Sequence, residues 1–142
     1  MFSWNYLFRS FLITARSPRI ALDFLRGKDV GVEIHARRIK EWSAIGKDNA
    51  YQPKRIFGMQ IFLNPEDYST VSTSIGTDGV LDLPLSCLFS KVLKKGMNVV
   101  DVGANLGYFT LLASKLVRDG RIFAFEPEEQ NFSAACQICV NK

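Results

Sequence analysis

The chain has 142 residues, of which 47% are hydrophobic and 23% charged, a composition typical of a globular domain with its own core. Its three cysteines form no paired framework, which argues against a small disulfide-stapled scaffold and favours a reducing, cytoplasmic location. The charge is uneven: residues 1–55 hold eleven Lys and Arg against five Asp and Glu, whereas residues 56–142 hold seven against nine. This asymmetry indicates either a solvated basic face, which is the commoner case, or contact of the N-terminal part with an anionic surface.

Residues 1–52 are predicted to form a mainly helical, basic leader region, with breaks near Pro18 and Gly27. Apolar residues recur at helical spacing near its start: Leu7, Phe8, Phe11, Leu12 and Ala15. Arginines interrupt every apolar run, so no stretch reaches the ~20 residues of a membrane span. Such a stripe packs on its own domain more often than it makes a weak contact with a membrane surface. We expect no nucleic-acid partner.

A short β segment is predicted next. Residues 55–63 alternate between apolar and other side chains, which predicts one strand. Gly76 and the pair Asp78-Gly79 predict turns. Pro84 predicts the start of a helix, because its missing N–H costs nothing in the first turn. That helix is expected to end near residues 94–96 and to carry one apolar stripe: Leu85, Leu88, Phe89 and Val92.

From residue 96 the pattern becomes an alternation of strands and helices. Apolar runs at 97–102 and 121–125 predict strands, and residues 106–118 and those from Pro127 onward predict helices. Strands that alternate with helices of this length imply a parallel sheet, so the predicted fold class is α/β.

The strongest functional signal lies at the predicted carboxyl ends of these strands, where open α/β sheets bind ligands. Gly103 and Gly107 flank the turn after the first strand, and a glycine lets the backbone turn tightly and approach a ligand closely. Glu126 ends the next strand, at about the ~20-residue offset where a carboxylate meets the hydroxyls of an adenosine ribose. We therefore predict a site for an adenosine-containing cofactor.

The turn itself discriminates between two such cofactors. The dinucleotide pattern G-x-G-x-x-G is absent, because Asn105 and Leu106 occupy its middle. Asp101 places a negative charge at the strand end, which would repel a pyrophosphate but suit the ammonium group of a methionine moiety. This chemistry favours S-adenosylmethionine (SAM) over NAD, and an NAD-dependent oxidoreductase remains the second enzyme hypothesis.

The same residues carry a resemblance to a known family. The run D-V-G-A-N-L-G-Y-F-T from Asp101 to Thr110, followed by F-E-P from Phe125 to Pro127, resembles the FkbM-type family of SAM-dependent methyltransferases. Residues 67–82 are similar to that family's preceding segment, though more loosely. The resemblance covers a little over half of the chain.

The resemblance implies the N-terminal part of a Rossmann-like, class I methyltransferase sheet and O-methylation of a sugar or another small hydroxylated metabolite. It also implies a set of cofactor-binding residues, with the glutamate at the ribose: Asp101, Gly103, Ala104, Asn105, Gly107 and Glu126. No catalytic residue and no metal site is predicted.

Residues 53–142 are then expected to be an incomplete SAM-binding domain, because the family fold continues with further strand–helix units after the second. On this interpretation the chain is part of a methyltransferase, and we expect no turnover by this part alone. The alternative is an inert fragment that only binds SAM. Cys136 and Cys139 lie within the last predicted helix without a partner pair, and are expected to pack in the core rather than to bind metal.

Overall fold

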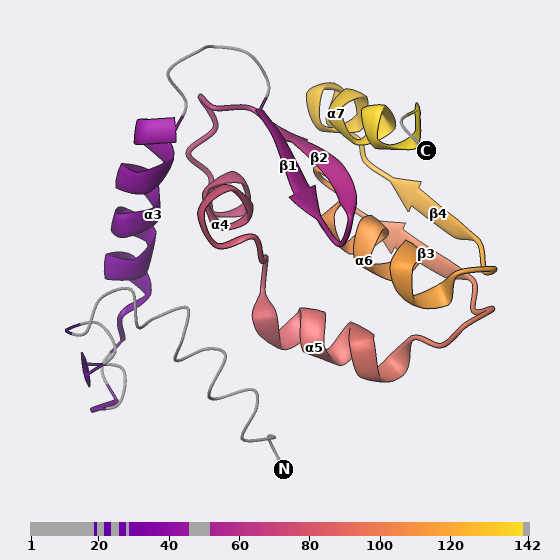
Figure 1. The fold of residues 1–142 in the computed structure, drawn as a ribbon, viewed down its shortest axis with the longest axis horizontal. Helices are drawn as coiled ribbons and strands as arrows, with labels where there is room; N and C mark the ends of the chain where they lie inside the picture. The colour runs from indigo at the N-terminus through magenta and orange to yellow at the C-terminus, as the bar shows by residue number, and fades with distance from the viewer. Residues whose placement is uncertain (1–18, 20–21, 24–25, 28, 46–51, 141–142) are drawn as a thin grey trace.

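The structure is a computed structural model that describes residues 19, 22–23, 26–27, 29–45 and 52–140. Within these residues, five α-helices and two two-stranded sheets form a mixed α/β arrangement (Figure 1). The elements are α3 (Gly31–Ile45), β1 (Gln52–Ile56), β2 (Met59–Leu63), α4 (Thr70–Asp78), α5 (Leu83–Val92), β3 (Val99–Val102), α6 (Tyr108–Val117), β4 (Ile122–Phe125) and α7 (Glu129–Val140).

The strand–helix alternation predicted from residue 96 onward is confirmed. Strands β3 and β4 pair in parallel, with Val99 opposite Ile122 and Val102 opposite Phe125. Helix α6 makes the crossover between them and packs against both strands. A parallel pair needs such a crossover, because both strands must start from the same edge. The predicted α/β class with a parallel sheet therefore holds, and the described part of that sheet has two strands.

The single strand predicted over residues 55–63 is wrong, because the structure has an antiparallel hairpin there. Strands β1 and β2 are joined at Phe57 and Gly58, and Ile56 pairs with Met59. Both turn residues have positive φ, 53° and 87°, as two-residue hairpin turns of type I′ require. The alternation of apolar residues continues through the turn, so the sequence pattern did not indicate the turn. Phe57 keeps this unusual backbone while its ring packs on that of Tyr108, with centroids 5.4 Å apart.

Helix α4 lies where the sequence predicted only turns. Gly76 is buried inside this helix, whereas Gly79 ends it with a left-handed backbone (φ 72°), as a helix-terminal glycine commonly does. Ser69 caps the first turn by accepting a hydrogen bond from the N–H of Ser72. The segment is rich in Ser and Thr, which form helices poorly, so tertiary packing and not propensity selects the helix.

Helix α5 begins as predicted but does not bury its apolar stripe. Asp82 caps it by accepting from the N–H of Leu85, and Pro84 lies in its first turn. None of its residues is buried, and Leu88 and Val92 remain 53% and 55% exposed. Its contact with the rest of the molecule runs through α6, where the rings of Phe89 and Phe109 lie 5.0 Å apart.

Helix α3 lies in the predicted leader region, and a turn at residues 26–27 agrees with the break predicted near Gly27. The helix packs against α4, and an ion-pair cluster joins the two. The carboxylate of Asp78, only 2% exposed, accepts from Arg38 Nε at 2.7 Å and from an Arg37 terminal nitrogen at 3.2 Å. The division at residue 52 stays a prediction, and the apolar stripe of residues 7–15 lies outside the described residues.

None of the helices in the described part of the chain is both long enough and apolar enough to cross a membrane.

One apolar core joins the hairpin to the helices around it. It includes nine buried residues from α3, both hairpin strands, α4, the turn before α6, α6 itself and α7: Trp42, Ile56, Ile61, Leu63, Ile75, Leu106, Tyr108, Leu111 and Ala134. Helix α6 lies between the hairpin and the β3–β4 pair (Figure 1), so its apolar residues serve both. The core thereby fixes the position of the β3–α6–β4 unit, which carries the candidate site.

Candidate functional site

The turn between β3 and α6 has a backbone that few residue types adopt. Gly103, Asn105 and Gly107 all have positive φ, at 79°, 52° and 85°. Glycine adopts this left-handed region without a steric penalty, and asparagine is among the few other residues that do so readily. Asn105 also accepts a hydrogen bond from the N–H of Leu106 with its own side-chain oxygen, at 2.8 Å. The G-x-N-x-G spacing is therefore required by the conformation of the turn itself.

Hydrogen bonds attach this turn to the end of β4. The N–H groups of Gly103 and Ala104 both donate to the carbonyl of Phe125, at 2.8 and 3.0 Å. Because β3 and β4 are parallel, their carboxyl ends meet at the same edge of the sheet. The glycine turn and Glu126, which follows Phe125 directly, are brought together there.

Glu126 is held by the backbone on both sides. One carboxylate oxygen accepts from the N–H of Asn105 at 2.7 Å, and the other accepts from the N–H of Glu128 at 2.9 Å. A carboxylate offers about four acceptor positions, so these two bonds orient the group and leave capacity for further donors. The side chain is half-buried at the end of the sheet, where a ligand can reach it.

Asp101 lies within β3, and its side chain turns toward α6. Its carboxylate accepts a hydrogen bond from the hydroxyl of Thr110, at 2.6 Å. This bond links the third residue of β3 to the first turn of α6, below the glycine turn. Asp101 and Thr110 are the first and last residues of the D-V-G-A-N-L-G-Y-F-T run, so a contact between strand and helix connects the two ends of that run.

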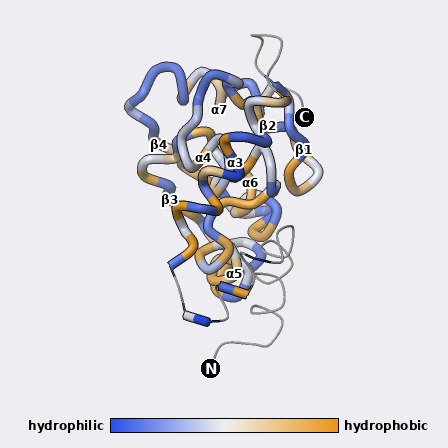
Figure 2. Tube along the Cα trace, turned by 90° about the vertical axis from the view of Figure 1, so that its left-hand side faces the viewer, coloured by the Kyte–Doolittle hydropathy of each residue, from blue (hydrophilic) through white to orange (hydrophobic). Residues whose placement is uncertain are grey.

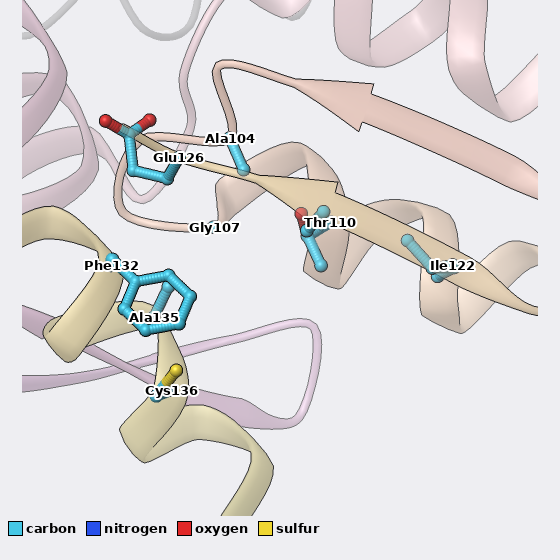
Figure 3. A pocket seen from close by; sticks show the side chains of 9 residues that line it. Ala104, Gly107, Thr110, Ile122, Glu126, Phe132, Ala135 and Cys136 are labelled. Carbon is cyan, nitrogen blue, oxygen red and sulfur yellow. The ribbon is translucent and has the colours of Figure 1, made fainter. Parts of the chain in front are cut away.

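A cavity of about 260 Å³ lies beside the turn, between β4, α6 and α7. Figure 3 shows Glu126 at one end, beside Ala104, and side chains of α7 along the opposite wall. Most of its surface is apolar, and Glu126 is the one ionisable carboxylate among its lining residues, which are Ala104, Gly107, Thr110, Ile122, Ala124, Glu126, Phe132, Ala135 and Cys136.

The predicted site residues thus divide into two groups. Five of them gather around the turn and the end of β4, namely Gly103, Ala104, Asn105, Gly107 and Glu126. Three of these also line the cavity, which are Ala104, Gly107 and Glu126. Asp101 is adjacent but has its carboxylate on the α6 side of β3, where Thr110 binds it.

The cavity wall from α7 was not predicted as part of the site. Phe132, Ala135 and Cys136 point into it (Figure 3). In this helix the sequence pattern singled out only Cys136 and Cys139, and both were expected to pack in the core. For Cys136 the core prediction is wrong, because this free thiol is exposed, and Ala134 is the α7 residue that packs in the core instead. The side chain of Cys139 lies outside the described part of α7.

In the part of the chain that the structure describes, no group of three or more His, Cys, Asp or Glu side chains could hold a metal ion. Comparisons of the chain with protein-family models, with curated proteins and with solved structures found no match.

Proposed function

We propose that the chain binds SAM at the glycine turn and Glu126, and that it is part of an enzyme that transfers a methyl group to a small hydroxylated acceptor. The observation that carries the proposal is the position of the Glu126 carboxylate, 2.7 Å from the N–H of Asn105 in a turn with three left-handed residues. A carboxylate beside an open backbone turn, at the carboxyl edge of a parallel strand pair, suits the ribose and the methionine end of this cofactor.

The hydrogen-bonding groups of the site and the space around them suit that ligand. An added Cβ at Gly103 would meet no atom within 4 Å, so the turn faces open space that a cofactor can enter. Glu126 has acceptor capacity for two vicinal hydroxyls, and each such charge-assisted bond stabilises a complex by roughly 1.5–3 kcal/mol. The adjoining cavity offers apolar surface, as ligand pockets commonly do.

In this proposal each group has a separate task. Glu126 binds the ribose hydroxyls and is itself oriented by the N–H groups of Asn105 and Glu128. The glycine turn brings bare backbone to the ligand. Asp101, fixed by Thr110, keeps a negative charge next to the methionine end. When bound, SAM supplies a methyl group on a positively charged sulfur, which an acceptor oxygen can displace.

The first experiment titrates the chain with SAM and, separately, with NAD by calorimetry. We expect SAM to bind, and Glu126→Gln to weaken its affinity about ten- to a hundredfold, the equivalent of ~1.5–3 kcal/mol. Glu129→Gln is the matched control, because it removes a nearby exposed carboxylate from the first turn of α7. An unchanged SAM affinity in folded Glu126→Gln, or binding of NAD alone, would contradict the proposal.

A pair of glycines separates contact with the ligand from backbone strain. Gly103 and Gly96 have nearly the same φ, 79° and 83°, and neither would place an added Cβ within 4 Å of another atom. Alanine should therefore strain both positions alike, but only Gly103 lies at the proposed site. We expect Gly103→Ala to lower SAM affinity and Gly96→Ala to leave it unchanged. Equal effects would assign Gly103 a purely structural role.

Methyl transfer itself is tested by incubating the chain with SAM carrying a labelled methyl group and a panel of sugars and other hydroxylated metabolites. Labelled acceptor would show that the chain is an active enzyme by itself. Binding of SAM without labelled product is expected if the chain is a part of the enzyme without turnover of its own, and it also fits the alternative of an inert binding unit.

A further inference from the structure

The β3–β4 pair presents one uncovered apolar face. Val100 and Val102 of β3 are 63% and 80% exposed, and Phe123 and Phe125 of β4 are 48% and 58% exposed. Val100 pairs with Phe123 and Val102 with Phe125, so all four side chains lie on the same face of the sheet. We call these four residues the bare face.

The opposite face of the same two strands is covered. Helices α6 and α7 lie on that side. Asp101 points toward it, because its carboxylate contacts Thr110 of α6, and Ile122 points toward it, because it lines the cavity. Figure 2 shows the β3–β4 pair at the margin of the molecule, with hydrophobic stretches in its trace. Parallel strands are normally covered on both faces, so the bare face is unusual for this kind of sheet.

The size of the bare face matches the apolar centre of a protein interface. Its four side chains expose on the order of 400–500 Å² of apolar surface, taking Phe at about 200 Å² and Val at about 150 Å². Contiguous apolar patches of that size on single proteins are often functional. A stable protein interface buries about 800 Å² per partner, of which roughly 60% is apolar, or about 480 Å². The bare face therefore supplies the apolar centre of one standard interface.

We propose that the bare face joins two copies of the chain, sheet against sheet, about a two-fold axis. A surface without charged side chains is complementary to itself, as a two-fold interface requires. Packed sheets lie about 10 Å apart with interdigitated side chains, which Val and Phe fill well. The proposal concerns the face opposite the cavity, and it does not depend on the cofactor.

The test measures the mass of the full chain by sedimentation equilibrium over a range of micromolar concentrations. We expect the unaltered chain to be a dimer, and Val102→Lys and Phe125→Lys each to give a monomer, because a buried unpaired charge opposes association. Val32→Lys is the matched control, because Val32 is 81% exposed on α3, away from the sheet, and this variant should remain a dimer. Circular dichroism verifies that each variant is folded.

Three outcomes would overturn the proposal. The first is an unaltered chain that is monomeric throughout, which would mean that a segment of the same chain or solvent covers the face. The second is a series of larger assemblies without a dominant dimer. The third is a dimer that survives both Val102→Lys and Phe125→Lys, which would place the interface elsewhere. SAM affinity is measured on Val100→Lys, which changes the bare face away from the glycine turn and Glu126. It should be unchanged, so failure of this proposal and failure of the proposed function can be told apart.

Discussion

The hairpin β1–β2 and the pair β3–β4 are both short, apolar two-stranded sheets, but they are covered to very different degrees. Ile61 and Leu63 of the hairpin are 0% exposed, whereas Val102 and Phe125 of the parallel pair are 80% and 58% exposed. The core around the hairpin receives residues from α3, α4, α6 and α7, while α6 and α7 lie on only one side of the parallel pair. Apolar sequence alone therefore does not say how much a strand contributes to stability.

The difference separates the part of the molecule that holds the core from the part that carries the proposed binding site. Burial of apolar surface stabilises by roughly 25 cal/mol per Å², so the hairpin core supplies most of this term. The parallel pair instead carries the left-handed turn, the oriented carboxylate and the exposed face. Regions with few buried contacts commonly carry the binding functions of a protein.

The largest expected difference in the free energy of unfolding comes from deleting one large side chain in each region. Trp42 is 2% exposed and its ring N–H donates to the carbonyl of Asp67 at 3.1 Å. We expect Trp42→Ala to lower the free energy of unfolding by about 3–5 kcal/mol. Phe125→Ala, the control on the bare face, should cost less than about 1.5 kcal/mol, since half of its surface is already in water. Urea unfolding at a low protein concentration measures both. Similar losses would abolish the contrast between the two regions.

A smaller effect comes from adding one methyl group where the packed region has no room. An added Cβ at Gly76 would overlap the six-membered ring of Trp42. We expect Gly76→Ala to destabilise the chain by about 1–3 kcal/mol, although alanine is the better helix former. In the background of Trp42→Leu the same change should cost much less, because the ring is gone. A double-mutant cycle from thermal or urea unfolding measures this coupling, and additive losses would show that the ring is not the obstacle.

The smallest effect concerns the bond that braces the parallel pair. Thr110→Val keeps the shape of the side chain but removes the hydroxyl that donates to Asp101. The expected cost is about 1 kcal/mol, and Thr110→Ser, which keeps the hydroxyl, should cost less. Hydrogen exchange should speed up locally at the start of α6 in Thr110→Val. If the loss spread instead through the hairpin core, the two regions would be one cooperative unit.

The elements that the sequence predicted correctly are those whose cause lies within a few neighbouring residues. The apolar runs and breaker residues located β3, α6, β4 and α7, and Pro84 located the start of α5. Gly103 and Gly107 likewise indicated a turn, because left-handed backbone restricts residue choice at those positions themselves. The juxtaposition of Glu126 with that turn followed from the parallel order of the strands.

The features that sequence could not supply depend on residues far apart in the chain. Helix α4 has poor helix formers, and it exists because Trp42 and Ile75 bury it against α3 and the hairpin. The turn at Phe57 and Gly58 lacks the usual Asn-Gly signal, and Phe57 is fixed by its contact with Tyr108.

By itself, then, the sequence determined the strand–helix order from residue 96, the glycine turn and the carboxylate that follows β4, because propensity and backbone sterics act locally. Only the tertiary structure decided which apolar faces are covered. The periodicity of α7 and of β3 shows that a face is apolar, but not what lies against it. Phe132 and Cys136 therefore line a cavity, and Val100 and Val102 face solvent, although each was apolar enough for a core.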